Sequence, residues 1–191
     1  MTTTTKITRK RAMAIAVAKD VLKRLKLEKL TLKFGNYLLP NGSFPSTGSL
    51  QEEIDKAEAN CQVCALGGMF LSHVRLHNKV QCENMCNMYI DSSPFALIVD
   101  KLSKVFTRTE IALIEGVFEG VVFNSYLISD TQDVPLLVSA CKKYRSMIVK
   151  RAKVGNKYGL MHQHLLTTIC RNIIRNKGKF IIPKKYFKDT E

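Results

Sequence analysis

The most distinctive stretch of the chain reads Cys61-Gln-Val-Cys-Ala-Leu-Gly-Gly-Met-Phe-Leu-Ser-His-Val-Arg-Leu-His77. Its apolar residues recur at the spacing of one helix face: Val63, Leu66, Phe70 and Val74. Glycines inside an apolar helix usually let another helix approach closely, although they also let a ligand approach the backbone. We therefore predict that this stretch is the central core helix, with Gly67 and Gly68 at a packing contact.

The same helical spacing of apolar residues appears on both sides of this stretch. An amphipathic helix is expected at about Thr8–Leu27, and Ser93-Pro94 begins another helix, because proline is favoured in a first turn. Thr107 or Thr109 caps the helix after that. On this capped helix the acidic residues are expected to face outward: Glu110, Glu115 and Glu119.

Two long basic helices follow, joined by a short link around Gly155-Asn156, and Gly178 ends the second. Leu30–Leu39 carries β-type residues and is expected to form a short strand or an extended arm. The fold predicted from these patterns is all-α, a single helical domain of about six or seven helices with short extended arms over residues 1–191. Residues 1–6 are expected to be a flexible N-terminal segment and residues 179–191 a basic C-terminal arm.

Composition limits the class of protein. Hydrophobic residues make up 46% and charged residues 24% of the chain, as in globular proteins, which excludes a mainly disordered or fibrous chain. No apolar run approaches the ~20 residues that span a bilayer, so we expect no membrane partner. The first residues lack the apolar core of a secretory signal, and we expect a cytoplasmic protein.

Charge is concentrated at the two ends of the sequence. The chain has 30 Lys and Arg against 16 Asp and Glu, a net charge of +14. Residues 1–33 contain ten basic and two acidic residues, and residues 133–191 contain fourteen basic and three acidic ones, whereas the middle is mildly acidic. The sequence leaves open whether the two ends form one basic face or two separate ones. Such an excess favours an anionic partner, nucleic acid or a nucleotide.

The two basic helices contain the candidate ligand-binding residues. If they pack antiparallel, their polar faces form one positive groove. The candidate cations and the histidine are Lys142, Arg145, Lys153, His164, Arg171 and Arg175, and the aromatic residues available to stack bases are Tyr144 and Tyr158. Tyr186-Phe187, inside Lys184–Lys188, is a further aromatic pair among cations. The alternative is that these are solvated faces, and that Arg171 and Arg175 only complement the carbonyl end of their own helix.

Six cysteines without an export signal indicate free thiols in a reducing compartment. Cys61, Cys64, Cys82 and Cys86 are weak candidates for a structural zinc site, because pairs at this spacing supply two ligands each. Zinc knuckles usually carry turn-forming residues near their ligands, which are missing here. The preferred interpretation is therefore no cofactor, with buried cysteines and a surface histidine pair, His73 and His77.

No sequence motif of a known catalytic class appears: no phosphate-binding loop, nucleophile elbow or zinc-protease helix. His162 and His164 are two residues apart on a predicted helix, so their side chains diverge. We expect a protein that is not an enzyme.

Three short segments resemble an uncharacterised family of small proteins encoded by bacteriophages and prophages. They are Cys61-Gln-Val-Cys-Ala-Leu-Gly-Gly, Leu113-Ile-Glu-Gly-Val-Phe-Glu119 and Asn172-Ile-Ile-Arg-Asn-Lys-Gly-Lys-Phe180. The resemblance implies a phage-type origin and a place in the bacterial cytoplasm or in the virion. It supplies no activity and no site residues.

The function expected is binding of nucleic acid or a nucleotide, and the alternative is a virion component or host-factor inhibitor that acts through protein contacts.

Overall fold

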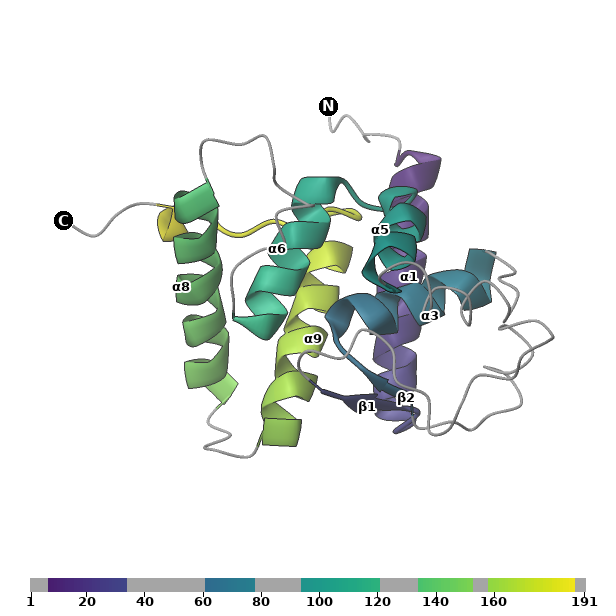
Figure 1. Cartoon of the computed structure of the whole chain (residues 1–191), viewed down its shortest axis with the longest axis horizontal. Helices are drawn as coiled ribbons and strands as arrows, with labels where there is room; N and C mark the ends of the chain where they lie inside the picture. The colour runs from purple at the N-terminus through teal and green to yellow at the C-terminus, as the bar shows by residue number, and fades with distance from the viewer. Residues whose placement is uncertain (1–6, 34–60, 78–93, 121–133, 153–157, 188–191) are drawn as a thin grey trace, which may run out of the picture.

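The computed structural model of the chain describes residues 7–33, 61–77, 94–120, 134–152 and 158–187. These residues are mostly helical, with two short strands, so the predicted all-α class is confirmed (Figure 1). The elements in chain order are α1 (Arg9–Lys26), β1 (Leu30–Leu32), β2 (Cys61–Val63), α3 (Ala65–His77), α5 (Pro94–Ser103), α6 (Arg108–Glu119), α8 (Val134–Ala152), α9 (Tyr158–Arg175) and the 3-10 turn η1 (Lys184–Tyr186).

Helix α3 is the core helix that the sequence predicts. Its first ten residues, Ala65–Val74, are all buried, and it packs against α1, α5 and α6. A Cβ placed on Gly68 would lie 3.6 Å from Val63, 3.8 Å from Leu166 and 3.8 Å from Leu30, which are ordinary packing distances. The glycine therefore lies at a packing contact with both strands and α9, as expected, and no ligand is needed to explain it.

The start of this stretch differs from the prediction. Cys61–Val63 is a strand, β2, which pairs in parallel with β1 so that Leu30 lies opposite Cys61 and Leu32 opposite Val63. The helix begins only at Ala65. Periodicity could not separate the two, because Val63 also fits the helical stripe that continues through Leu66 and Phe70, and three residues are too few to show the alternation of a strand. The predicted strand at Leu30–Leu39 is confirmed for Leu30–Leu32, and residues 34–39 lie outside the described part of the chain.

Helix α1 forms where the sequence predicts it. Thr8 caps its first turn by accepting a hydrogen bond from the Arg11 backbone N–H at 3.4 Å. Its basic residues Lys19, Lys23 and Lys26 are exposed, as predicted.

Helix α6 begins with a complete capping box. Thr107 accepts from the Glu110 backbone N–H at 3.1 Å, and the Glu110 carboxylate accepts from the Thr107 backbone N–H at 2.8 Å.

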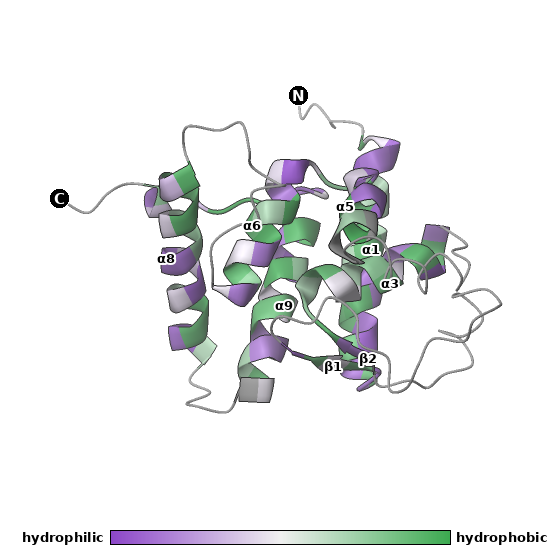
Figure 2. Ribbon diagram, in the orientation of Figure 1, coloured by the Kyte–Doolittle hydropathy of each residue, from purple (hydrophilic) through white to green (hydrophobic). Residues whose placement is uncertain are grey.

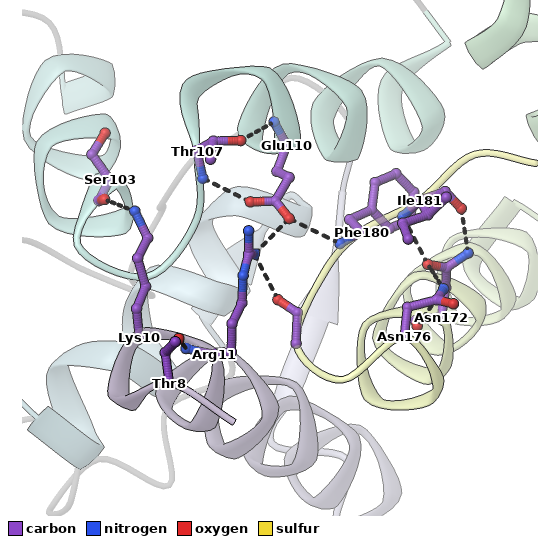
Figure 3. A network of polar contacts seen from close by, with 11 residues as sticks. Thr8, Lys10, Arg11, Ser103, Thr107, Glu110, Asn172, Asn176, Phe180 and Ile181 are labelled. Atoms are coloured by element: carbon purple, nitrogen blue, oxygen red, sulfur yellow. Dashed lines mark hydrogen bonds and ion pairs between the residues drawn. The ribbon is translucent and has the colours of Figure 1, made fainter. Parts of the chain in front are cut away.

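The prediction that the acidic residues of α6 face outward is wrong. Glu110 and Glu115 are buried, 7% and 8% exposed, and Glu119 is half-buried. Figure 3 shows why Glu110 is buried. Its carboxylate accepts hydrogen bonds from the Arg11 guanidinium at 2.6 Å and from the Phe180 backbone N–H at 3.3 Å. Because one cation and two backbone donors contact it, this carboxylate is buried without the penalty of an isolated charge.

The segment after α9 turns back across the molecule toward α8 (Figure 1). Gly178 makes the turn possible, since its φ is +87° and a Cβ there would lie 3.0 Å from the Arg11 Cα. Its carbonyl accepts a hydrogen bond from Arg11 at 3.0 Å. Gly178 is therefore the helix stop that the sequence predicts, and it also brings the basic C-terminal segment against α1.

One hydrophobic core joins residues of all six described α-helices. Figure 2 shows hydrophobic residues gathered where α3, α6 and α9 meet, whereas α8, at the edge of the molecule, mixes hydrophobic and hydrophilic residues along its length. None of the described helices is long and apolar enough to cross a membrane. The predicted flexible segment at residues 1–6 and the end of the arm at residues 188–191 lie outside the described residues.

Candidate functional site

A groove lies between α8, α9 and the segment that follows α9. Helices α8 and α9 pack side by side and run antiparallel, as the short link between them predicts (Figure 1). The groove has a volume of about 650 Å³. Ligand pockets commonly measure about 300–1,000 Å³, so the hollow has the size of a binding site for one or two small groups.

The described residues that line this groove include four cations and no carboxylate. Arg151 comes from the end of α8, Arg171 and Arg175 from α9, and Lys185 from η1. Arg171 and Arg175 are one helical turn apart, about 6 Å along the axis. A concave surface with charge of one sign attracts an oppositely charged ligand more strongly than a flat surface does.

The groove arginines differ from Arg11 and Arg75 in their partners. Arg11 pairs with Glu110 at 2.6 Å, and Arg75 pairs with Asp20 at 2.5 Å. By contrast, Arg151, Arg171 and Arg175 are exposed and make no ion pair within the described part of the chain. Their charge is therefore available to a ligand.

Asn172 of α9 connects the three parts of the chain that form one end of the groove through hydrogen bonds. Its side-chain amide donates to the Tyr144 hydroxyl at 3.1 Å and to the Ile181 carbonyl at 2.8 Å, and its oxygen accepts from the Ile181 backbone N–H at 3.0 Å. Asn176 donates to that same oxygen at 2.9 Å. Figure 3 shows these contacts of Asn172 with Ile181 and Asn176. One side chain thus fixes the returning segment to α9 and α8.

The aromatic residues of the groove are placed differently from the prediction. Tyr144 was expected to be available for stacking, but it is only 6% exposed, and its ring packs 6.5 Å from Phe180 and 5.4 Å from Tyr186 between centroids. Tyr186 is half-buried, and the Lys185 ammonium lies 5.0 Å from its ring centroid. The ring that a ligand can reach is therefore Tyr186. The side chain of Tyr158 lies outside the described part of the structure.

The cations predicted for α8 do not all reach the groove. Lys142 is exposed on another face of α8, beside Lys150. Arg145 was predicted to face solvent, and this prediction is wrong. It is half-buried and donates to the Val117 carbonyl at 3.1 Å and to the Phe118 carbonyl. Burial lowers the pKa of Arg145, and Glu119 opposes that shift. This arginine therefore satisfies the carbonyl end of α6, and Lys153 lies outside the described residues.

The two histidines of the His162-x-His164 pair diverge as expected. His164 lines the groove with Arg171 and Arg175, so four predicted site residues meet there, with Tyr144 as the fourth. His162 is buried on the other side of α9, and its Nδ1 lies 3.2 Å from the Leu32 carbonyl oxygen. Burial lowers the pKa of His162, the hydrogen bond to Leu32 opposes this shift, and Arg145 adds to it. The pair does not form one acid–base site.

The described cysteines do not form a reactive or metal-binding cluster. Cys64, Cys141 and Cys170 are buried free thiols, and burial raises the pKa of Cys64 and of Cys141 to about 12. Thiols held protonated in this way are poor nucleophiles and poor ligands. No group of three or more His, Cys, Asp or Glu side chains among the described residues is placed to hold a metal ion. Cys82, Cys86 and the side chain of Cys61 lie outside those residues, so the zinc hypothesis stays a prediction.

The histidine pair at the end of α3 differs from the prediction. His77 is exposed, but His73 is 1% exposed, with its ring centroid 5.5 Å from that of His77. The pair is therefore not a surface pair. His73 lies on the buried face of α3, because α3 is surrounded by α1, α5 and α6 over most of its length.

Sequence reasoning did not select Arg151, Asn172 and Lys185 as groove residues. Arg151 was recognisable as one more cation on the same basic helix. Asn172 had no signal of its own, because its role depends on Ile181, nine residues later, returning to the same helix. Comparison of the chain with protein-family models, with curated proteins and with solved structures gave no match.

Proposed function

We propose that this chain is a non-enzymatic binding protein, of the phage type that its three short segments resemble, and that it binds nucleic acid through the α8–α9 groove. The observation that supports this is the lining of the groove, where four cations meet no carboxylate among the described residues. Arginine is well suited to the contact, since its planar fork holds a phosphate through two hydrogen bonds.

The surroundings of the groove suit a long anion better than a short one. The other face of α8 carries Lys142, Lys143 and Lys150, and Arg151 borders both this face and the groove. Cations therefore continue past the groove and around α8. A polyanion makes use of such an extended surface, and the release of its counterions contributes to affinity.

The test compares two charge-reversal variants by fluorescence anisotropy with labelled DNA at several salt concentrations. Arg171→Glu with Arg175→Glu changes the groove, and Lys19→Glu with Lys23→Glu makes the same change on the exposed face of α1. We expect the groove variant to lose at least about tenfold in affinity, and its salt slope to fall by about 1.4 for a single strand, since each lost phosphate contact removes ~0.7. The α1 variant should lose less than about threefold.

Two results would contradict the proposal. An equal loss in both variants would mean that DNA binds to the net charge of +14 rather than to this groove. No DNA or RNA binding at low salt by the wild-type chain would instead favour a protein partner, either a virion protein or a host factor. Circular dichroism of both variants checks that each has kept its helices.

A further inference from the structure

The groove contains an apolar surface that phosphate binding does not require. Ile181 is 44% exposed although it is a large aliphatic residue, and it lines the groove with Met147, Ile148 and Pro183. Tyr186 adds a half-buried aromatic ring on the same segment. The groove therefore offers both cations and an apolar surface to a ligand.

We infer that the groove takes a single strand rather than a duplex, with at least one unpaired base against Tyr186; this inference rests on the proposed function. In a duplex the base faces are stacked on one another and only phosphates, sugars and base edges are accessible. In a single strand each base has a free π face, and aromatic side chains bind such faces without regard to sequence.

The dimensions of the groove favour the same choice. Its volume of about 650 Å³ accommodates one or two nucleotides. A duplex is far wider and can only lie across the exposed arginines, out of reach of the recessed ring. The α9 residues that line the groove extend from His164 to Arg175, about 16 Å along the helix axis. A short length of single strand therefore reaches Arg151 at one end and Lys185 at the other.

Lys185 and Tyr186 form the part of the groove that binds the base. The Lys185 ammonium, 5.0 Å from the Tyr186 ring centroid, occupies a position above that ring in the free protein. Such a contact near the surface is weak. A base that replaces the ammonium at the ring leaves Lys185 beside the phosphate of the same nucleotide. Asn172 keeps the ring in place, because it anchors Ile181 and hydrogen-bonds to Tyr144, on which Tyr186 packs.

The experiment first varies the ligand and leaves the protein unchanged. Wild-type chain is titrated with three labelled probes of equal length at low salt: oligothymidine, the same sugar–phosphate backbone without bases, and a duplex. Base stacking contributes about 5- to 100-fold per base, so the abasic probe should bind weaker than oligothymidine by at least that lower factor. The duplex should bind with lower affinity than oligothymidine, and its affinity should not depend on its sequence.

Variants then locate the contact. Tyr186→Ala should weaken oligothymidine binding about 5-fold or more and leave the abasic probe unchanged, whereas Tyr186→Phe should leave both unchanged. If Tyr186→Ala disturbs the returning segment, affinity for the abasic probe also falls, and the comparison of probes on the wild-type chain decides. Equal affinity for oligothymidine, abasic probe and duplex would overturn the single-strand inference and leave the proposed function standing. Binding of none of the three would overturn both, and an acidic peptide would become the candidate ligand.

Discussion

The contact between Arg11 and Glu110 is expected to be one of the main links in the fold. It joins α1 to α6 across 99 positions of sequence, and through the Gly178 carbonyl and the Phe180 N–H it also holds the segment that completes the groove. Substitution of Arg11 by Met keeps most of the side-chain volume and removes the charge. The Glu110 carboxylate would then remain in place with two backbone donors and no cation.

The structure sets the size of the effect. Breaking a fully buried ion pair by removing one partner costs about 3–5 kcal/mol. Here the side chains are 19% and 10% exposed, so water recovers part of that loss, and we expect about 2–3 kcal/mol. For a chain of this length, each kcal/mol lowers the melting temperature by about 2–4 °C, which gives a decrease of about 4–12 °C. The matched control is Arg9→Met, an exposed arginine two residues earlier, which should change stability by less than about 0.5 kcal/mol.

A double-mutant cycle tests the cause. Chemical denaturation of Arg11→Met, Glu110→Gln and the double variant should show a coupling free energy of about 1–3 kcal/mol, because the second substitution removes a carboxylate that has already lost its cation. Additive effects of the two substitutions, or equal stability of Arg11→Met and Arg9→Met, would refute this account of the contact.

Three further predictions concern other parts of the fold. Gly178→Ala should destabilise the chain by about 2–4 kcal/mol in denaturant titrations, because φ is +87° and the new methyl meets the Arg11 backbone; Gly159→Ala, whose methyl meets nothing within 4 Å, should be neutral or slightly stabilising. Burial, with smaller contributions from His77, Lys104 and Lys101, lowers the pKa of His73 to about 4. Between about pH 6.5 and pH 4 the unfolded chain therefore binds a proton that the folded chain does not, so the free energy of unfolding should fall by up to about 3 kcal/mol as the pH drops through that range. In His73→Gln the fall should be smaller, and an unchanged pH profile would exclude His73 as its source. Native-state alkylation followed by peptide mapping should leave Cys141 and Cys170 unmodified until denaturant is added, since burial raises the pKa of both thiols; rapid labelling of either in the folded protein would contradict their burial.

The helices were predictable because their signals are local. The N-cap at Thr8, the capping box at Thr107 and Glu110, the stop at Gly178 and the three-and-four spacing of apolar residues all act within a few positions of sequence. The strand β2 was not predictable in this way. Its partner β1 lies about thirty residues earlier in the sequence, and its three residues have no alternation long enough to register.

The burial of Glu110 shows a second limit of sequence reasoning. A glutamate three residues after a threonine indicates a capping box, and such a carboxylate ordinarily faces solvent. Here a second and a third partner, Arg11 and the Phe180 N–H, arrive from opposite ends of the chain and cover it. Hydropathy cannot anticipate a polar group that is buried because other polar groups surround it.

The candidate groove depended on the same distinction, between cations that the fold uses and cations that it leaves available. In the sequence Arg11, Arg145 and Arg171 all lie on basic helices and are equivalent. In the structure Arg11 neutralises a buried carboxylate and Arg145 satisfies the carbonyls at the end of α6, so neither can contribute much to a ligand. Arg171 has no such partner among the described residues, and the same holds for Arg151 and Arg175 in the same groove. A net charge of +14 alone therefore says little about where an anion binds, whereas three exposed arginines around one hollow specify a site that two substitutions can test.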